Sequence, residues 1–389
     1  MANEKKERVR LEETANFCYR NVCIATQANI PWFWKGNPGL GKTSILEALA
    51  QELNVPLHIE IGAISDPIDI NGALFPDPEG YVVRKAMKWV EEFAGSDGII
   101  VYDELPHSPP AIQAAMLRVI CESKVGEVDL GPNVKRGAIG NPTEVAGGYD
   151  MNPALANRFC HIDWDSRGYA EYWMDGMMNG FRLDIPILPK GWDDRLRYWQ
   201  TNVAIFAGKY KKTVLSALPE QEEHRVGPWP SPRTWTMGAR LLSAAESFGE
   251  DVQISLLSGL VGAGAAGEFY SWFKSLDLPD PEALLKNAEL FPTLKPGKEH
   301  VAYAIVTNVL AHIQNRPDAT EAKRNSDWVN AWKVLYQAAK QNPGLSFGFV
   351  QTMIDLRPSF KVQAPKEARD LIVQYGRDID ILPNISLTK

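Results

Sequence analysis

The residues with the clearest chemical meaning lie in one glycine-rich stretch near the start of the chain. Gly36, Gly41, Lys42 and Thr43 match the spacing G-x-x-x-x-G-K-[ST], the pattern of a phosphate-binding loop. In such a loop the glycines let backbone N–H groups point at phosphate oxygens, the lysine reaches the β- and γ-oxygens, and the threonine hydroxyl binds Mg²⁺. The residues expected to hold the phosphates form one run: Gly36, Asn37, Pro38, Gly39, Leu40, Gly41, Lys42, Thr43 and Ser44.

The segments on either side of this loop support that interpretation. An apolar run over 30–34 precedes the loop as a strand would, and a helical pattern over 44–50 follows it. A helix that begins directly after the loop adds a positive dipole end beneath the phosphates. Strand, glycine loop and helix are the setting that the motif requires, so the sequence predicts a nucleotide-binding site.

A second distinctive segment is an apolar run that ends in two acids. Residues 99–102 are followed by Asp103 and Glu104. A buried strand here would bring Asp103 beside the phosphates, where it can hold Mg²⁺ directly or through water. Glu104 is then the candidate general base that polarises an attacking water. Two solvated acids at a strand end are the alternative, and the phosphate loop upstream disfavours it.

Two polar residues follow further along the chain. Asn141 comes soon after the strand-like run 136–139, and its amide can donate to a terminal phosphate or orient water. Alone, Asn-Pro is only a turn signal. Arg158 precedes the strand-like run 159–162, and an arginine can neutralise charge in phosphoryl transfer, an effect worth about 10³–10⁵ in rate. A lone arginine is more often an ordinary surface residue, so this role for Arg158 depends on the other motifs found with it.

These candidate residues require a parallel sheet to position them. Strand-like runs at 56–61, 98–102, 136–139 and 159–162 alternate with helical ones. Alternating β and α segments predict an α/β fold with a parallel sheet covered by helices on both faces. The ligand is then expected at the carboxyl ends of the strands.

The order of these motifs resembles that of the AAA+ ATPases, in particular the MoxR-type (helix-2-insert) branch. The likeness is carried by GNPGLGKT, YDELPHSPPAIQAAML, GNPTE, LANRF and SPRTW, and it spans about residues 22–248. It implies ATP and Mg²⁺ as cofactors and a ring, usually a hexamer, with ATP at each subunit boundary. Arg158 would be the finger that reaches the neighbour's site, and Arg233 the second sensor on the lid. Tyr102 departs from the family's apolar pattern, and we expect its hydroxyl to reach the sheet edge.

Two hairpins fit that branch. Strand-like runs flank the turn 76–80 within the segment 66–88, and a second hairpin is expected in 125–136. The resemblance suggests that the first insert faces a central pore. Ordinary surface loops are the alternative.

The resemblance and the helical patterns together predict three domains: an α/β nucleotide-binding core at 1–165, a helical lid at 166–275 and a helical C-terminal domain at 276–389. The aromatic residues of the lid are expected in its core. The run 262–267 matches G-x-G-x-x-G but lies in a helical apolar stretch, so we expect a tight helix contact and not a nucleotide loop. Apolar residues at helical spacing predict two buried faces in the last domain: Trp328, Trp332, Leu335 and Ala339, and Ile305, Val309 and Ile313.

Composition limits the possible partners. The chain of 389 residues has a net charge of −7, which gives no overall attraction to nucleic acid or anionic membranes. Its four cysteines form no C-x-x-C pair, which favours reduced thiols over zinc or disulfides. The apolar run 254–267 is shorter than the ~20 residues that span a bilayer. We therefore expect a cytoplasmic protein without membrane insertion.

The leading hypothesis is an ATPase that remodels a partner protein. The resemblance suggests a von Willebrand A-domain partner, and because this chain has no D-x-S-x-S motif the partner would be a separate chain. A ring-shaped DNA motor is the alternative; it would use basic residues near the two hairpins: Arg84, Lys85, Lys88, Lys124, Lys135 and Arg136. A nucleotide-gated structural ring that hardly turns over is a third possibility. The client, the subunit number and the nucleotide that Arg233 serves are not determined by the sequence.

Overall fold

The computed structural model describes residues 19–141, 149–166, 169–181, 183–214, 218–276, 278–295, 299–314, 319–341, 347–358 and 362–375. Its contacts divide the chain into two units: Met1–Lys190 with Tyr210–Glu268, and Gly191–Lys209 with Phe269–Lys389. This division does not follow the three consecutive segments expected from the sequence, because residues 191–209 belong with the C-terminal helices. A lid that acts as a domain of its own stays a prediction.

The first unit is built on a five-stranded parallel sheet, which confirms the α/β class. The strand order is β2 (Leu57–Ile61), β5 (Gly98–Asp103), β8 (Val134–Gly140), β1 (Trp32–Lys35), β9 (Cys160–Asp163). Each strand coincides with a predicted run. The strands β1 and β5 are buried and apolar along most of their length, as strands covered on both faces are, whereas β2 is only partly buried. The carboxyl ends of β1, β5 and β8, where the candidate residues follow, share one edge of this sheet.

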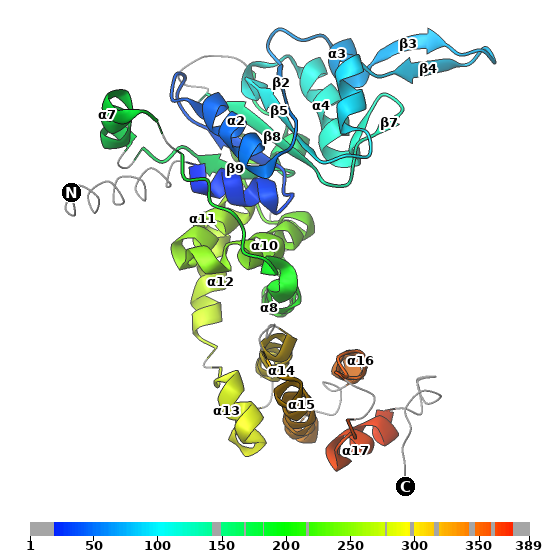
Figure 1. Ribbon diagram of the computed structural model, residues 1–389, viewed down its shortest axis with the longest axis vertical. Coiled ribbons are helices and arrows are strands. Elements are labelled where there is room, and N and C mark those ends of the chain that lie inside the picture. Colours follow the sequence, from blue (N-terminus) through cyan, green and yellow to red (C-terminus); the bar gives the residue numbers. More distant parts are fainter. Residues whose placement is uncertain are drawn as a thin grey trace. The chain divides into compact units, whose positions relative to one another are not determined.

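The sheet of the first unit is accompanied by helices, of which α2 and α4 lie beside the strands (Figure 1). These helices are α2 (Lys42–Leu53), α3 (Pro67–Asn71), α4 (Pro110–Glu122), α6 (Pro153–Ala156), α7 (Tyr169–Asn179), α9 (Lys211–Val214), α10 (Pro232–Ala244) and α11 (Glu250–Val261). Ile112 and Met116 of α4 share one buried cluster with Phe33 and Ile100 of the sheet. Helix α4 thereby fixes the sheet strands that end in the candidate site.

Both expected hairpins are present. The first pairs β3 (Ala73–Pro76) with β4 (Val82–Lys85), and Figure 1 shows it projecting from the sheet and its helices. The second pairs β6 (Lys124–Val125) with β7 (Val128–Asp129) and ends earlier than expected. The backbone N–H of Glu127 donates to the carbonyl oxygen of Arg84 at 3.2 Å, so the second hairpin contacts the base of the first. The first hairpin exposes several large apolar side chains: Leu74, Phe75, Tyr81 and Val82.

The second unit is helical. Its helices are α8 (Leu196–Lys209), α13 (Pro281–Lys286), α14 (Glu299–Gln314), α15 (Glu321–Gln341), α16 (Phe347–Asp355) and α17 (Lys366–Tyr375), and α12 (Ala263–Lys274) runs across the division. The two predicted apolar faces lie in one cluster, which confirms them: Ile305, Val309, Trp328, Trp332, Leu335 and Ala339 are buried, and Ile313 packs against them.

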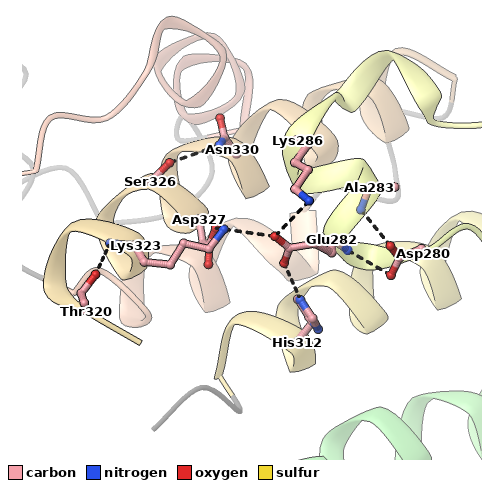
Figure 2. A network of polar contacts seen from close by, with 10 residues as sticks. All are labelled: Asp280, Glu282, Ala283, Lys286, His312, Thr320, Lys323, Ser326, Asp327 and Asn330. Atoms are coloured by element: carbon pink, nitrogen blue, oxygen red, sulfur yellow. Dashed lines mark hydrogen bonds and ion pairs between the residues drawn. The ribbon is translucent and has the colours of Figure 1, made fainter. Parts of the chain in front are cut away.

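A polar network also joins three helices of this unit (Figure 2). The carboxylate of Glu282 on α13 accepts from His312 Nε2 of α14 at 3.1 Å and from Lys323 Nζ of α15 at 3.2 Å. Lys323 also pairs with the buried Asp327 at 2.9 Å. Asp280 caps α13 and accepts from the N–H groups of its first turn.

Three expectations from the sequence are wrong in detail. Tyr102 is 1% exposed and its hydroxyl has no hydrogen-bond partner in the described part of the chain, so the hydroxyl does not reach the sheet edge. Trp173 on α7 is 47% exposed and is not a core residue. The tight contact expected in the run 262–267 is not found at Gly264 or Gly267, which face open space. In the preceding helix, by contrast, a Cβ added at Gly259 would lie 2.2 Å from the carbonyl oxygen of His161. Gly262 simply separates α11 from α12.

Among the described residues, none of the helices combines the length and apolar character that crossing a bilayer demands.

Candidate nucleotide site

The phosphate loop joins β1 to α2 at the edge of the sheet. The N–H of Gly36 donates to the carbonyl oxygen of Gly140 at 3.1 Å, which ties the loop to the end of β8. Lys42 is 8% exposed, and its ammonium donates to the carbonyl oxygens of Gly36 at 2.7 Å and Asn37 at 2.8 Å. Burial lowers the pKa of Lys42, and the neighbouring carboxylate of Asp103 opposes that shift. The ammonium therefore lies inside the loop and close to the acid at the end of β5.

Glycine is required at specific points of this loop. An added Cβ at Gly36 would lie 2.6 Å from the Cβ of Trp164, so no side chain fits there. Gly39 and Gly41 have φ of 78° and 82°, a left-handed conformation that favours glycine. Gly41 caps α2, whose first N–H groups and positive dipole end suit an anion. These features fit a nucleotide phosphate.

The acidic pair has a distinctive backbone. Asp103 ends β5, and its carboxylate accepts the N–H of Glu104 at 2.8 Å. Glu104 has φ of 57° and ψ of 34°, which is uncommon for a residue other than glycine and is typical of functional sites.

Oxygen donors at this edge suit Mg²⁺. The hydroxyl of Thr43 and the carboxylate of Asp103 are the hard oxygen ligands that this ion prefers. Among the described residues there is no group of three or more His, Cys, Asp and Glu side chains that would hold a metal alone. That donor set fits an ion whose other ligands are water and phosphate, which is how Mg²⁺ usually binds with nucleotides.

Asn141 lies where it was expected, directly after β8 and half-buried at the same edge. It lines a cavity of about 770 Å³ that also includes Lys35 and Trp164. The cavity is not lined by any residue of the run 36–44, so it adjoins the phosphate loop without enclosing it. Residues 142–144, which complete the GNPTE segment, lie outside the described part.

Arg158 and Arg233 lie together, away from the phosphate loop. Arg158 immediately precedes Phe159 and the amino end of β9, whereas the loop follows Lys35, which is level with Asp163. The four residues of β9 put roughly 13 Å between these edges. Burial raises the pKa of the Cys121 thiol, and Arg158 and Arg233 both oppose that shift by their charge, Arg158 also through a hydrogen bond. Both guanidinium groups therefore flank the end of α4, at the opposite edge of the sheet.

Several residues of the site were missed by sequence reasoning. Gln113 on α4 is 1% exposed, donates to the carbonyl oxygens of Ser108 and Asp150, and accepts the N–H of Asn152 at 2.8 Å. It braces the segment that leads to Arg158. A glutamine inside an apolar helical face was the one available signal.

Tyr169 was also missed as a site residue. Its hydroxyl donates to the carbonyl oxygen of Leu40 in the phosphate loop at 2.7 Å, across 129 positions of the sequence. Its ring contacts Trp164, which stacks on Trp34 at a ring-centroid distance of 5.1 Å. The start of α7 is thereby joined to the loop, a contact for which the sequence gives no signal.

A known family matches the part of the chain that carries this candidate site. Residues 32–161 match the family described as "ATPase family associated with various cellular activities (AAA)". The match covers about a third of the chain, so that part is similar to the ATPase domains of this family. The matched range includes the glycine-rich loop, Asp103, Glu104, Asn141 and Arg158. No curated protein matches the chain. Among solved structures, a candidate ATPase from Cytophaga hutchinsonii is similar, with 18% identity, a TM-score of 0.42, and coverage of 67% of this chain and 86% of that one.

Proposed function

We propose that this protein is a ring-forming, Mg²⁺-dependent ATPase of the MoxR type in which every ATP lies between two copies of the chain. The observation that carries the proposal is the placement of Arg158 and Arg233 at one edge of the sheet, with the phosphate loop at the other. This placement favours a nucleotide of a neighbouring copy over the chain's own nucleotide as the target of both arginines. We propose that a second copy supplies both, so that Arg233 serves the nucleotide of the neighbouring copy.

The roles of the chain's own residues follow from their chemistry. The loop N–H groups and the Lys42 ammonium would bind the β- and γ-phosphates. Thr43 and Asp103 would hold Mg²⁺, which supplies positive charge to the phosphates when bound. Glu104 would accept a proton from the attacking water, and Asn141 would orient that water or donate to the terminal phosphate.

The same proposal includes a remodelling role and a hexameric ring. Hydrolysis at each boundary would change the shape of the interface between copies. We propose a separate von Willebrand A-domain protein as the partner, on the strength of the MoxR-like motifs alone. The exposed apolar tip of the β3–β4 hairpin, with Phe75 and Tyr81, is a surface that a protein client could contact.

A DNA motor is the less favoured function. Of the basic residues that it would use, Lys124 is paired with Asp129 at 3.0 Å, and Arg136 is partly buried and donates to the carbonyl of Ile120 at the end of α4. DNA binding that falls steeply with salt would favour the motor, because phosphate neutralisation releases counterions. Binding that is absent at low salt would exclude it.

The experiment that tests the proposed ATPase compares two variants with the wild type. Lys42→Ala is expected to abolish nucleotide binding. Arg158→Ala is expected to keep the affinity for ATP within a few-fold but to lower turnover at least a hundredfold, since the arginine acts in the transition state. Equilibrium titration and steady-state hydrolysis measure the two effects. Full turnover in Arg158→Ala would contradict the shared site, and nucleotide binding by Lys42→Ala would contradict the phosphate loop.

A further inference from the structure

The two segments that carry the arginines are joined by a buried hydrogen bond. Ser231 Oγ donates to Asn157 Oδ1 at 2.9 Å, and Asn157 Nδ2 donates to the carbonyl oxygen of Trp229 at 3.0 Å. Asn157 is 3% and Ser231 is 8% exposed. These residues lie 74 positions apart in the sequence, so this joint exists only in the folded unit.

Each partner of the joint is adjacent to an arginine in a defined backbone position. Asn157 ends α6 and directly precedes Arg158. Ser231 caps α10, where it accepts the N–H of Thr234 at 3.2 Å, and Arg233 lies in the first turn of that helix. The hydrogen bond therefore connects the backbone that carries one guanidinium to the backbone that carries the other.

We propose that Asn157 and Ser231 are positioning residues that set Arg158 and Arg233 as a pair before either meets a nucleotide. Arginine side chains are long and lose much rotamer freedom when they bind, so a fixed spacing of their backbones favours simultaneous contact with one triphosphate. A buried hydrogen bond between polar groups holds such a spacing, since breaking it leaves both groups unsatisfied away from water. The role rests on the proposed function, because it presupposes that the pair serves a neighbouring copy.

The positions of Arg158 and Arg233 beside Cys121 are a second observation that places the two arginines together. This thiol, at the end of α4, is hydrogen-bonded to Arg158 and also feels the charge of Arg233. Both arginines thus lie near the same thiol, in the same unit of the chain.

The first measurement is steady-state hydrolysis by Asn157→Ala and Ser231→Ala. Both variants are expected to lose about ten- to hundredfold in kcat with KM for ATP nearly unchanged, because displacement of about 1 Å at a catalytic group costs that much. Ser231→Thr keeps the hydroxyl and should restore kcat. Asn152→Ala is the matched control on the same short helix: it removes an exposed cap, where Oδ1 accepts the N–H of Ala154 at 2.8 Å, and leaves the joint intact. A wild-type kcat in both joint variants would overturn the proposal.

The second measurement separates positioning from general loss of structure. Asn157→Ala subunits should fail as arginine donors but remain good nucleotide acceptors, so mixing them with Glu104→Gln subunits should restore hydrolysis. Each interface joins the nucleotide site of one subunit to the arginines of the next. In a random mixture of equal amounts, about a quarter of the interfaces therefore combine an intact nucleotide site with intact arginines. Arg158→Ala with Glu104→Gln is the reference mixture. Recovery in the Arg158→Ala mixture without recovery in the Asn157→Ala mixture would overturn the positioning role of Asn157. A lack of recovery in both mixtures would overturn the proposed shared site itself.

The third measurement reads the placement of the arginines without nucleotide. In a Cys18→Ser background, the pH profile of Cys121 alkylation gives the pKa of this exposed thiol, because Cys23 and Cys160 are buried. Asn157→Ala should raise that pKa toward the value found in Arg158→Ala, since Arg158 lowers it. An unchanged profile in Asn157→Ala, with a raised pKa in Arg158→Ala, would overturn the positioning role.

Discussion

At the scale of single residues, the site separates into groups that the sequence identifies and groups that only the fold identifies. Lys42, Thr43 and Asp103 are recognisable because phosphate and Mg²⁺ chemistry requires those types at that spacing. Asn157 and Ser231 carry no such signal, since asparagine and serine are common in turns and caps. Their significance comes from a contact across 74 positions, which no local pattern encodes.

Tyr102 provides a stability prediction at this scale. Its hydroxyl is buried without a partner in the described part of the chain, and such a group costs about 1–3 kcal/mol of desolvation. Tyr102→Phe removes only this hydroxyl, so we expect an unchanged or higher melting temperature, by roughly 2–4 °C.

The matched control is Tyr19→Phe, at another buried tyrosine, whose hydroxyl donates to the carbonyl of Asp184 at 3.1 Å. That change should lower the melting temperature, because it leaves an acceptor without its donor. Thermal unfolding followed by circular dichroism distinguishes the two. A marked loss of stability in Tyr102→Phe would mean that its hydroxyl is satisfied.

At the scale of elements, the strands were predictable and the helices around the site less so. Buried parallel strands are largely apolar, and all five strands contain an apolar run that was visible in the sequence. Helix α7 was expected to pack its aromatic residues inward, but Trp173, Met177 and Met178 are exposed and Gly176 is its one buried residue among those described. Helical spacing shows that residues share a face; it does not show whether anything in the same chain covers that face.

The contact between α7 and the phosphate loop leads to a binding prediction. Tyr169→Phe removes the hydrogen bond to the carbonyl of Leu40, and the loop should become less ordered before it binds phosphate. We expect the Kd for ATP to rise about fivefold, which corresponds to a loss of about 1 kcal/mol for one hydrogen bond.

Fluorescence titration with an ATP analogue measures this effect. Tyr81→Phe is the control, because Tyr81 is 68% exposed at the tip of the β3–β4 hairpin. Equal affinities in Tyr169→Phe and the control would show that α7 does not support the loop.

At the scale of the whole molecule, the division into two units was not predictable from the order of the motifs. The sequence favoured a core, a lid and a C-terminal domain in succession. In the structure, residues 191–209 leave the first unit and return to it at Tyr210, and Trp199 and Phe206 of that segment pack with Phe273 and Phe269 of the second unit. Aromatic residues in the expected lid gave no indication of which unit they would join.

The network around Glu282 is the corresponding prediction for the second unit. Glu282→Gln should lower the stability of that unit by roughly 0.5–1 kcal/mol, a modest amount because the partners are partly exposed. Hydrogen bonds to Asp327 and Glu282 raise the pKa of Lys323. Because the pKa of Lys323 is higher in the folded state, its ion pairs contribute their full stabilisation at pH values below the usual pKa of a lysine. That stabilisation is lost as the pH rises through the pKa of Lys323 in the folded protein.

Urea unfolding at several pH values measures this contribution. The difference between Glu282→Gln and the wild type should be constant from about pH 7 to 9 and should shrink in more alkaline solution, where Lys323 loses its proton. ATP affinity should not change, since the phosphate loop lies in the other unit. A difference that grows with alkaline pH would contradict this assignment.

That one ATP is completed by two copies of the chain is tested most directly by the structure of the assembly bound to a non-hydrolysable ATP analogue. We expect the guanidinium groups of Arg158 and Arg233 to lie within hydrogen-bonding distance of a terminal phosphate whose other oxygens are held by Lys42 of the adjacent copy. A nucleotide surrounded by a single chain, with both arginines directed into solvent, would contradict it.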